Sequence, residues 1–293
     1  MKRFTITEFR EMYPDDDTCL DKIFTLRFNN LVCPKCESDK KFTKVNDRRS
    51  YQCPNCGFQV YPTKDTIFEK TTTPLTYWFY AIFLQTTTRN GVAAKELERQ
   101  LNVCYKTALR MSHQIKILMA DKTFYKLSGT VQIDETYIGM KMINKHRKER
   151  AEHYENGGTG KDNKTGVIGF INQDKKIKME VMKDDISTFK DLVKKHVSKD
   201  STIVTDSHPS YSGLNLHYIK HEVVNHLQNE FKRGEFHTNA IENAWSNLKR
   251  TIKGTHIHVS PKHLQKYVDE VAFRLMNRDR QDEMFEIILN HVV

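Results

Sequence analysis

The stretch VQIDETYI, residues 131–138, has the length and apolar character of a β-strand, and further apolar segments of strand length follow it along the chain. These segments span residues 165–171, 176–182, 201–205 and 222–224. A helical pattern at residues 186–197 separates the third strand from the fourth, and more helical patterns follow the fifth. This part of the chain is therefore predicted to be a mixed α/β domain.

The order of three strands, a helix, another strand and then helices predicts a ribonuclease-H-like core over residues 128–275. In such a core the first and fourth strands are neighbours. Their pairing would bring Asp134, on the first strand, close to Asp206, at the end of the fourth. Residues 140–164 interrupt the core, and their many lysines and arginines predict an exposed basic loop beside Asp134.

A third carboxylate, Glu242, lies in a helical pattern. The apolar stripe of this helix consists of Ile241, Trp245, Leu248 and Ile252. Glu242 lies at the edge of the stripe, on the same arc as Lys249, so it can face the two aspartates. Two strand aspartates and a helix glutamate are the oxygen ligands that a pair of magnesium ions needs for phosphoryl transfer. The alternative is that Glu242 and Lys249 are ordinary surface charges of an amphipathic helix.

Glu135 competes with Asp134 for the first position of this acidic set. Alternation along a strand puts the two side chains on opposite faces of the sheet. Glu135 shares its face with the apolar Val131 and Ile133, so Asp134 is the predicted ligand. Glu135 is then expected to support the site without binding the metal.

Four cysteines predict a zinc ribbon over residues 29–66. They form the pairs Cys33/Cys36 and Cys53/Cys56, each with two residues between the thiols. This spacing is typical of one structural zinc ion held by four thiolates. Strand patterns at residues 41–45 and 49–52 predict a hairpin, and residues 57–61 a third strand.

The remaining two cysteines, Cys19 and Cys104, have no partner at ligand spacing and are expected to be buried thiols. A helical segment at residues 1–28 is expected before the ribbon, and a C-terminal helix at residues 276–293.

Residues 72–122 are predicted to be helical and to resemble a helix-turn-helix. Helical patterns cover residues 75–84, 93–101 and 106–119, with a short turn before the last. In a helix-turn-helix the first residues of the second helix enter the major groove, so Lys106 and Arg110 are predicted DNA contacts. An ordinary helical hairpin is the alternative.

The charge of the chain favours a polyanionic partner. Lysine and arginine number 47 against 37 acidic residues, which gives a formal net charge of +10. Phosphates neutralised by such residues release counterions, so double-stranded DNA is the first partner to consider, although a basic solvated surface has the same composition. The chain has no apolar run of about 20 residues and no apolar signal segment, so we expect no membrane span and a cytoplasmic location.

Three blocks of the sequence resemble those of DDE transposases. The blocks are VQIDETYIG (131–139), TDSHPSY (205–211) and HTNAIENAWSNLKR (237–250), and the tail GTHIHVSPKHLQKY (254–267) is similar too. Together with the ribbon, they look most like the bacterial insertion-sequence group with an N-terminal zinc ribbon, which is related to the Merlin elements. The resemblance covers essentially the whole chain.

The resemblance implies roles for particular residues. Asp134, Asp206 and Glu242 would be the triad for two Mg²⁺ or Mn²⁺ ions, and Lys249 and Arg250 would contact DNA. Ile138–Lys141 departs from the Gly-Gly-Lys that often follows the first block, and some relatives have a third residue other than glutamate. Asn243 and Asn239 therefore remain alternatives to Glu242.

The implied activity is cleavage of DNA at the ends of a mobile element followed by strand transfer into a target. A homo-oligomer assembled on DNA at the nucleoid of a bacterial host is the implied setting. Two other functions stay open from the residues alone, namely a transposase-derived DNA-binding protein without catalysis and a nuclease of the same fold.

Overall fold

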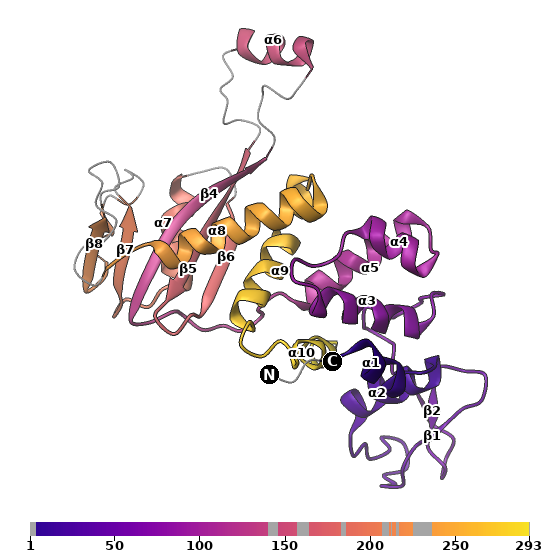
Figure 1. Ribbon diagram of the computed structural model, residues 1–293. Helices are drawn as coiled ribbons and strands as arrows, with labels where there is room; N and C mark the ends of the chain where they lie inside the picture. Colours follow the sequence, from indigo (N-terminus) through magenta and orange to yellow (C-terminus); the bar gives the residue numbers. More distant parts are fainter. Residues whose placement is uncertain are drawn as a thin grey trace. The chain divides into compact units, whose positions relative to one another are not determined.

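The computed structural model describes residues 4–139, 146–156, 164–182, 186–206, 211, 213–214, 217–224 and 236–292. The chain divides into two compact units (Figure 1). One unit contains Met1–Met119 together with Arg280–Val293, and the other contains Ala120–Asp279. Each unit is described by itself below.

The first unit contains a small antiparallel sheet in the order β1-β2-β3. Its strands are β1 (Thr43–Lys44), β2 (Tyr51–Gln52) and β3 (Gln59–Val60). The predicted hairpin and third strand are therefore confirmed, although each strand is only two residues long. Phe24 stacks on Tyr51 with a centroid distance of 3.9 Å, which joins a neighbouring helix to this sheet.

Six helices complete the first unit among the residues that the structure describes. They are α1 (Ile6–Met12), α2 (Asp16–Phe28), α3 (Leu75–Thr87), α4 (Ala94–Leu101), α5 (Tyr105–Leu118) and α10 (Met284–Asn290). Thr5 and Glu8 form a capping box at the start of α1, and Asp15 caps α2. The three helices predicted between residues 75 and 119 are confirmed as α3, α4 and α5.

An aromatic cluster joins the two ends of the chain within this unit. Phe9 of α1 packs on Phe83 of α3 at 5.0 Å, and Phe285 of α10 packs against both Phe9 and Tyr13. The Tyr13 hydroxyl also donates to Glu286. The C-terminal helix thus belongs to the same core as the N-terminal helices, because burial of aromatic surface holds them together.

The second unit is built on a five-stranded mixed sheet in the order β6-β5-β4-β7-β8. The strands are β4 (Thr130–Gly139), β5 (Lys164–Asn172), β6 (Ile177–Val181), β7 (Thr202–Asp206) and β8 (Lys220–Val224). β4, β5 and β6 pair antiparallel, whereas β7 and β8 continue the sheet in parallel with β4. The expectation that the first and fourth strands are neighbours is confirmed by the pairing of β4 with β7.

Helices cover both faces of this sheet. On one face α7 (Ile186–His196) packs through Phe189 and Val193 against Val131 and Ile133 of β4. On the other face α8 (Asn239–Thr251) and α9 (Leu264–Met276) pack on the sheet, and Figure 1 shows α8 running across the central strands. The predicted apolar stripe of α8 is confirmed, since its four residues are buried in this second layer: Ile241, Trp245, Leu248 and Ile252.

Residues 140–164 contain a helix, α6 (Arg147–Glu155), where an exposed basic loop was expected. None of its residues is buried. An apolar periodicity is therefore missing, and this explains why the sequence pattern does not predict the helix. The flanking residues 140–145 and 157–163 lie outside the described residues.

Two short helical segments follow α8. A π-helical turn, η5 (Ile252–His256), extends its last turn, and a 3₁₀ turn, η6 (Pro261–His263), leads into α9. Among the described residues, no helix is both long and apolar enough to cross a bilayer.

Candidate functional site

Asp134 and Asp206 lie on neighbouring strands. In the parallel pair β4–β7, Thr130 is opposite Thr202 and Gln132 is opposite Val204. Asp134 and Asp206 lie two residues beyond this last pair on their strands, and the charge of Asp206 acts on the Asp134 carboxyl. Because side chains two residues apart share a face, both aspartates belong to the face that α8 covers.

Asp134 is held in a mostly apolar environment. Burial raises the pKa of its carboxyl to about 7, with the nearby charge of Glu135 as the second cause and that of Asp206 as a smaller one. The indole N–H of Trp245 donates to Oδ2 of Asp134 at 2.8 Å and opposes this rise. A cation beside Asp134 would likewise favour the ionised carboxylate.

Gln132 fixes the start of α8 on β4. Its Oε1 accepts from the backbone N–H groups of Ala240 and Ile241, at 3.1 and 3.2 Å. Thr238, the residue at the N-cap of α8, makes no side-chain capping bond, so a side chain from the sheet caps this helix instead. The amide Nε2 of Gln132 also lies 3.3 Å from Nδ1 of His237.

Glu242 is exposed in the first turn of α8, one turn before Trp245. Its Oε1 accepts from the hydroxyl of Thr238 at 2.6 Å. Helix α8 is thus attached to β4 on either side of Glu242, through Gln132 and through the Trp245–Asp134 bond. These attachments bring the helix of Glu242 to the strand of Asp134.

The three carboxylates do not close into a compact ligand set. Over the described ranges, only the four ribbon cysteines form a group of three or more metal-binding side chains whose ligand atoms all lie within 4.8 Å. The structure therefore brings the elements of Asp134, Asp206 and Glu242 together and leaves their oxygens too far apart to be such a group.

The other polar residues of α8 that were singled out from the sequence lie on its surface. Lys249, Arg250, Asn239 and Asn243 are all exposed. Exposure leaves the lysine and arginine accessible to a polyanion. It does not distinguish Glu242 from the two asparagines as the third ligand.

Glu135 lies on the face opposite to Asp134, as strand alternation predicts. The buried hydroxyl of Tyr211 donates to its Oε2. Tyr211 follows β7 in the chain, and this bond joins it to the residue after Asp134 on β4. In the sequence, the only feature that marks Tyr211 is its place at the end of the TDSHPSY block.

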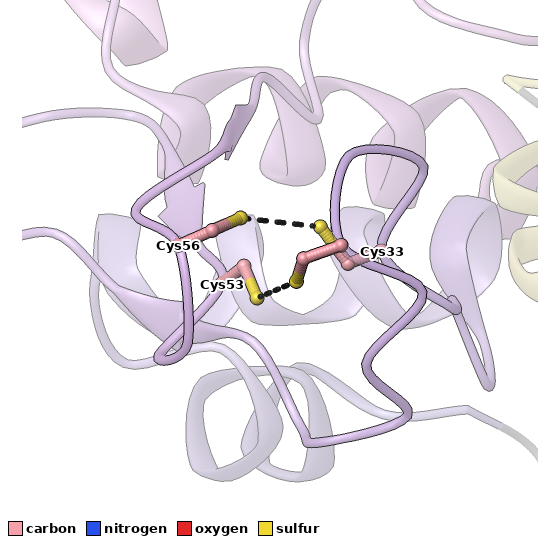
Figure 2. A group of neighbouring side chains, drawn as sticks. Cys33, Cys53 and Cys56 are labelled. Atoms are coloured by element: carbon pink, nitrogen blue, oxygen red, sulfur yellow. Dashed lines mark hydrogen bonds between the residues drawn. The ribbon is translucent and has the colours of Figure 1, made fainter.

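The four ribbon cysteines fit one tetrahedral zinc ion. The Sγ atoms of Cys33 and Cys56 are 3.6 Å apart, and those of Cys36 and Cys53 are 3.7 Å apart (Figure 2). A tetrahedron with Zn–S bonds of about 2.3 Å has edges of about 3.8 Å. The donor set and its spacing therefore match a structural zinc with four thiolate ligands.

Both cysteine pairs lie in matching backbone turns. The N–H of Cys33 donates to Ser38 and that of Cys53 to Phe58, and in each turn the residue after the second cysteine has a positive φ. That residue is Gly57 in the second turn, at φ 71°. Burial raises the pKa of the Cys33 thiol, but hydrogen bonds from the backbone N–H groups of Lys35 and Cys36 and from the thiols of Cys56 and Cys36 together lower it to about 7, which favours the thiolate that binds metal.

The predicted DNA contacts Lys106 and Arg110 are both exposed on α5. The turn before α5 begins with Asn102 in the left-handed conformation, at φ 49°, which ends α4. The guanidinium of Arg110 lies 5.7 Å from the ring centre of Trp78 on α3, so this side chain is partly oriented by stacking.

Cys19 and Cys104 were both predicted to be buried thiols, which is right for Cys19 and wrong for Cys104. Cys19 is fully buried, whereas Cys104 is exposed. Cys104 occupies the N-cap of α5, a position at the helix end that the apolar core does not reach.

Comparison with protein families identifies the second unit. The ISXO2-like transposase domain matches residues 126–276, which is more than half of the chain. The chain belongs to the ISXO2-like transposase family. A transposase zinc-ribbon domain also matches residues 14–59, so the predicted resemblance to insertion-sequence transposases with an N-terminal zinc ribbon is confirmed.

A relative of the chain is found in Halobacterium salinarum. The chain is 25% identical over 256 residues to an uncharacterised protein in the transposable element ISH50 of Halobacterium salinarum. The match covers 84% of this chain and 85% of the relative. The match therefore extends over most of both chains.

Proposed function

We propose that this protein is an active DDE transposase with a ribonuclease-H-like core, which cleaves DNA at the ends of its element and joins them to a target. The observation that supports this most is the parallel pairing of β4 with β7, because these neighbouring strands carry Asp134 and Asp206. Membership of the transposase family makes phosphodiester chemistry the natural use of this acidic pair.

Asp134, Asp206 and Glu242 would hold two Mg²⁺ or Mn²⁺ ions. The donor chemistry fits, because all three supply carboxylate oxygen and two of them come from adjacent strands. When bound, such ions activate a water or a 3′ hydroxyl for attack on a phosphodiester and stabilise the leaving oxygen. The three carboxylates do not lie within 4.8 Å of one another as a group, so their side chains would have to move closer together to share the ions.

Within this proposal the protein residues position the DNA and the acids. Lys249 and Arg250, exposed on α8, would contact phosphates near the scissile bond. Gln132 would keep α8 on the sheet, and Tyr211 would hold the side chain of Glu135, the residue after Asp134. Phosphoryl transfer depends mainly on such positioning and on charge stabilisation.

DNA would be bound by the first unit as well. The α4–turn–α5 segment has the order of a helix-turn-helix, and its second helix presents Lys106 and Arg110 to solvent. Double-stranded DNA is accordingly the proposed partner, with two or more copies of the chain assembled on two DNA ends.

The deciding experiment is a cleavage and strand-transfer assay on duplexes carrying the ends of the element, with Mg²⁺. We expect the wild-type chain to cleave and join, and Asp206→Asn to lose both steps by at least about 100-fold while it still binds the duplex. Asp200→Asn, an exposed aspartate before β7, is the matched control and should leave both steps unchanged.

Either of two results would contradict the proposal and favour another function. Binding without any cleavage by the wild-type chain would indicate a transposase-derived DNA-binding protein. Cleavage that never leads to joining, even with a pre-cleaved end, would indicate a nuclease.

A further inference from the structure

The strongest unassigned feature of the second unit is the contact between Trp245 and Asp134. Trp245 is 4% exposed, and its indole N–H lies 2.8 Å from Oδ2 of Asp134. A buried indole N–H needs an acceptor, and here the acceptor is a carboxylate of the proposed metal site. In the sequence, Trp245 is recognisable only as a member of the apolar stripe of α8.

The ring reaches this position because β5 has a glycine there. Gly169 is the partner of Asp134 across the β4–β5 pair. A Cβ atom at Gly169 would lie 2.6 Å from Cη2 of Trp245 and 2.7 Å from Cδ1 of Ile241. Any side chain at this position would displace the indole from the sheet, so the absence of a side chain creates the notch that seats it.

The hydrogen bond restricts the orientation of the carboxylate. Rotation about the last bond of an aspartate side chain is broad and has no sharp minima. A donor fixed to a packed helix holds one oxygen in place and so sets the plane of the whole group. Groups that contact metal ligands in this way tune metal affinity in other proteins by roughly 10- to 100-fold.

We propose that Trp245 is a positioning residue, seated in the Gly169 notch, that orients the Asp134 carboxylate to receive a divalent cation. The proposal rests on the function proposed above, because it assumes that Asp134 binds metal. On this proposal, the indole N–H of Trp245, which lies on the same helix as Glu242, sets part of the metal affinity.

The first test measures Mn²⁺ affinity of the full chain by calorimetry, without DNA. Trp245→Phe keeps most of the ring volume and removes the donor, and we expect it to weaken Mn²⁺ binding by about tenfold. Trp78→Phe is the matched control, because Trp78 is also buried and its indole donates to Thr71 at 3.1 Å, in the other unit. This control should leave Mn²⁺ affinity unchanged.

A second measurement does not depend on the folding of Trp245→Phe. The chain has two tryptophans, so ¹⁵N-labelled Trp78→Phe protein gives a single indole N–H signal. Saturating Mg²⁺ should shift that signal, and the Asp134→Asn substitution should abolish the shift. An indole signal that does not respond to Mg²⁺, or equal Mn²⁺ affinity for Trp245→Phe and wild type, would overturn the proposal.

Different results would refute the metal site and the role of Trp245. If Asp134→Asn and Asp206→Asn bind Mn²⁺ as well as the wild-type chain, the proposed metal site itself is wrong. If both substitutions weaken binding and Trp245→Phe does not, the site stands and the role of Trp245 is refuted.

Discussion

The neighbours of Asp134 shift the pKa of its carboxyl in opposite directions. Burial and the charge of Glu135 raise its pKa to about 7, while the Trp245 indole and the backbone N–H of Glu135 lower it. A carboxyl group in this range is readily ionised by an approaching cation. The chemistry expected of this residue therefore depends both on its neighbour Glu135 and on Trp245, which is 111 residues away in the chain.

The ribbon cysteines give a prediction that belongs to single residues. Replacing Cys36 by serine removes one of four thiolates, and we expect zinc content to fall from about one ion per chain to a small fraction of that. Zinc would be measured by elemental analysis after gel filtration. Cys104→Ser is the control, because this exposed cysteine lies outside the cluster and its loss should leave zinc content unchanged.

Individual elements are joined by a few polar contacts in addition to the apolar core. Glu180 of β6 accepts from Lys195 and lies 2.6 Å from the ring nitrogen of His196, and both partners are in the last turn of α7. These contacts attach α7 to the edge strand of the sheet. A carboxylate with such partners should be sensitive to acid.

This attachment predicts a particular pH dependence of stability. The hydrogen bond with His196 is the main cause that lowers the pKa of Glu180 from 4.5 to about 2, with Lys195 adding to it. Because the folded-state pKa is lowered, the stabilisation is fully present above about pH 4.5 and is lost as the pH falls toward about 2.

The test compares denaturant unfolding of the wild-type chain and Glu180→Gln. At pH 7 we expect the substitution to lower the free energy of unfolding by about 1–2 kcal/mol, and the difference should shrink toward pH 3. Glu152→Gln on the exposed α6 is the control and should change stability by less than about 0.5 kcal/mol at either pH. A difference that grows on acidification would contradict the assignment.

For the whole molecule, the net charge of +10 gives an expectation about DNA affinity. Each phosphate contact contributes to the salt dependence of binding, since it releases condensed counterions. Affinity for duplex DNA should therefore fall steeply between about 50 and 200 mM salt.

Lys106 provides the specific test of this expectation. If its ammonium group contacts a phosphate, Lys106→Ala should weaken binding across different sequences and reduce the slope of log affinity against log salt by about one. Fluorescence anisotropy with labelled duplexes would measure the slope. Glu96→Gln on α4 is the companion variant, because it removes a negative charge without removing a phosphate contact. If Glu96→Gln and Lys106→Ala reduce the salt slope equally, Lys106 does not contact a phosphate directly.

Much of the local structure follows from the sequence, because it depends on contacts between residues close in the chain. Apolar periodicity identified α3, α5, α8 and the five strands, and the cysteine spacing identified the ribbon. The helix α6 was missed for the same reason, since a helix with no buried residue leaves no periodic signal. Cys104 was placed wrongly because thiol burial depends on the position of a helix end.

Most of the elements, their order, the four cysteines of the ribbon and the family resemblance can be recognised in the sequence alone. The assembly of the site depends on tertiary packing: Gln132 caps a helix from a strand, Tyr211 binds Glu135, and Trp245 reaches Asp134 over Gly169. The physical reason is that these contacts depend on the depth and rotamer of side chains packed across the sheet. Such packing joins residues that are distant in the chain, and local patterns of hydrophobicity do not encode it.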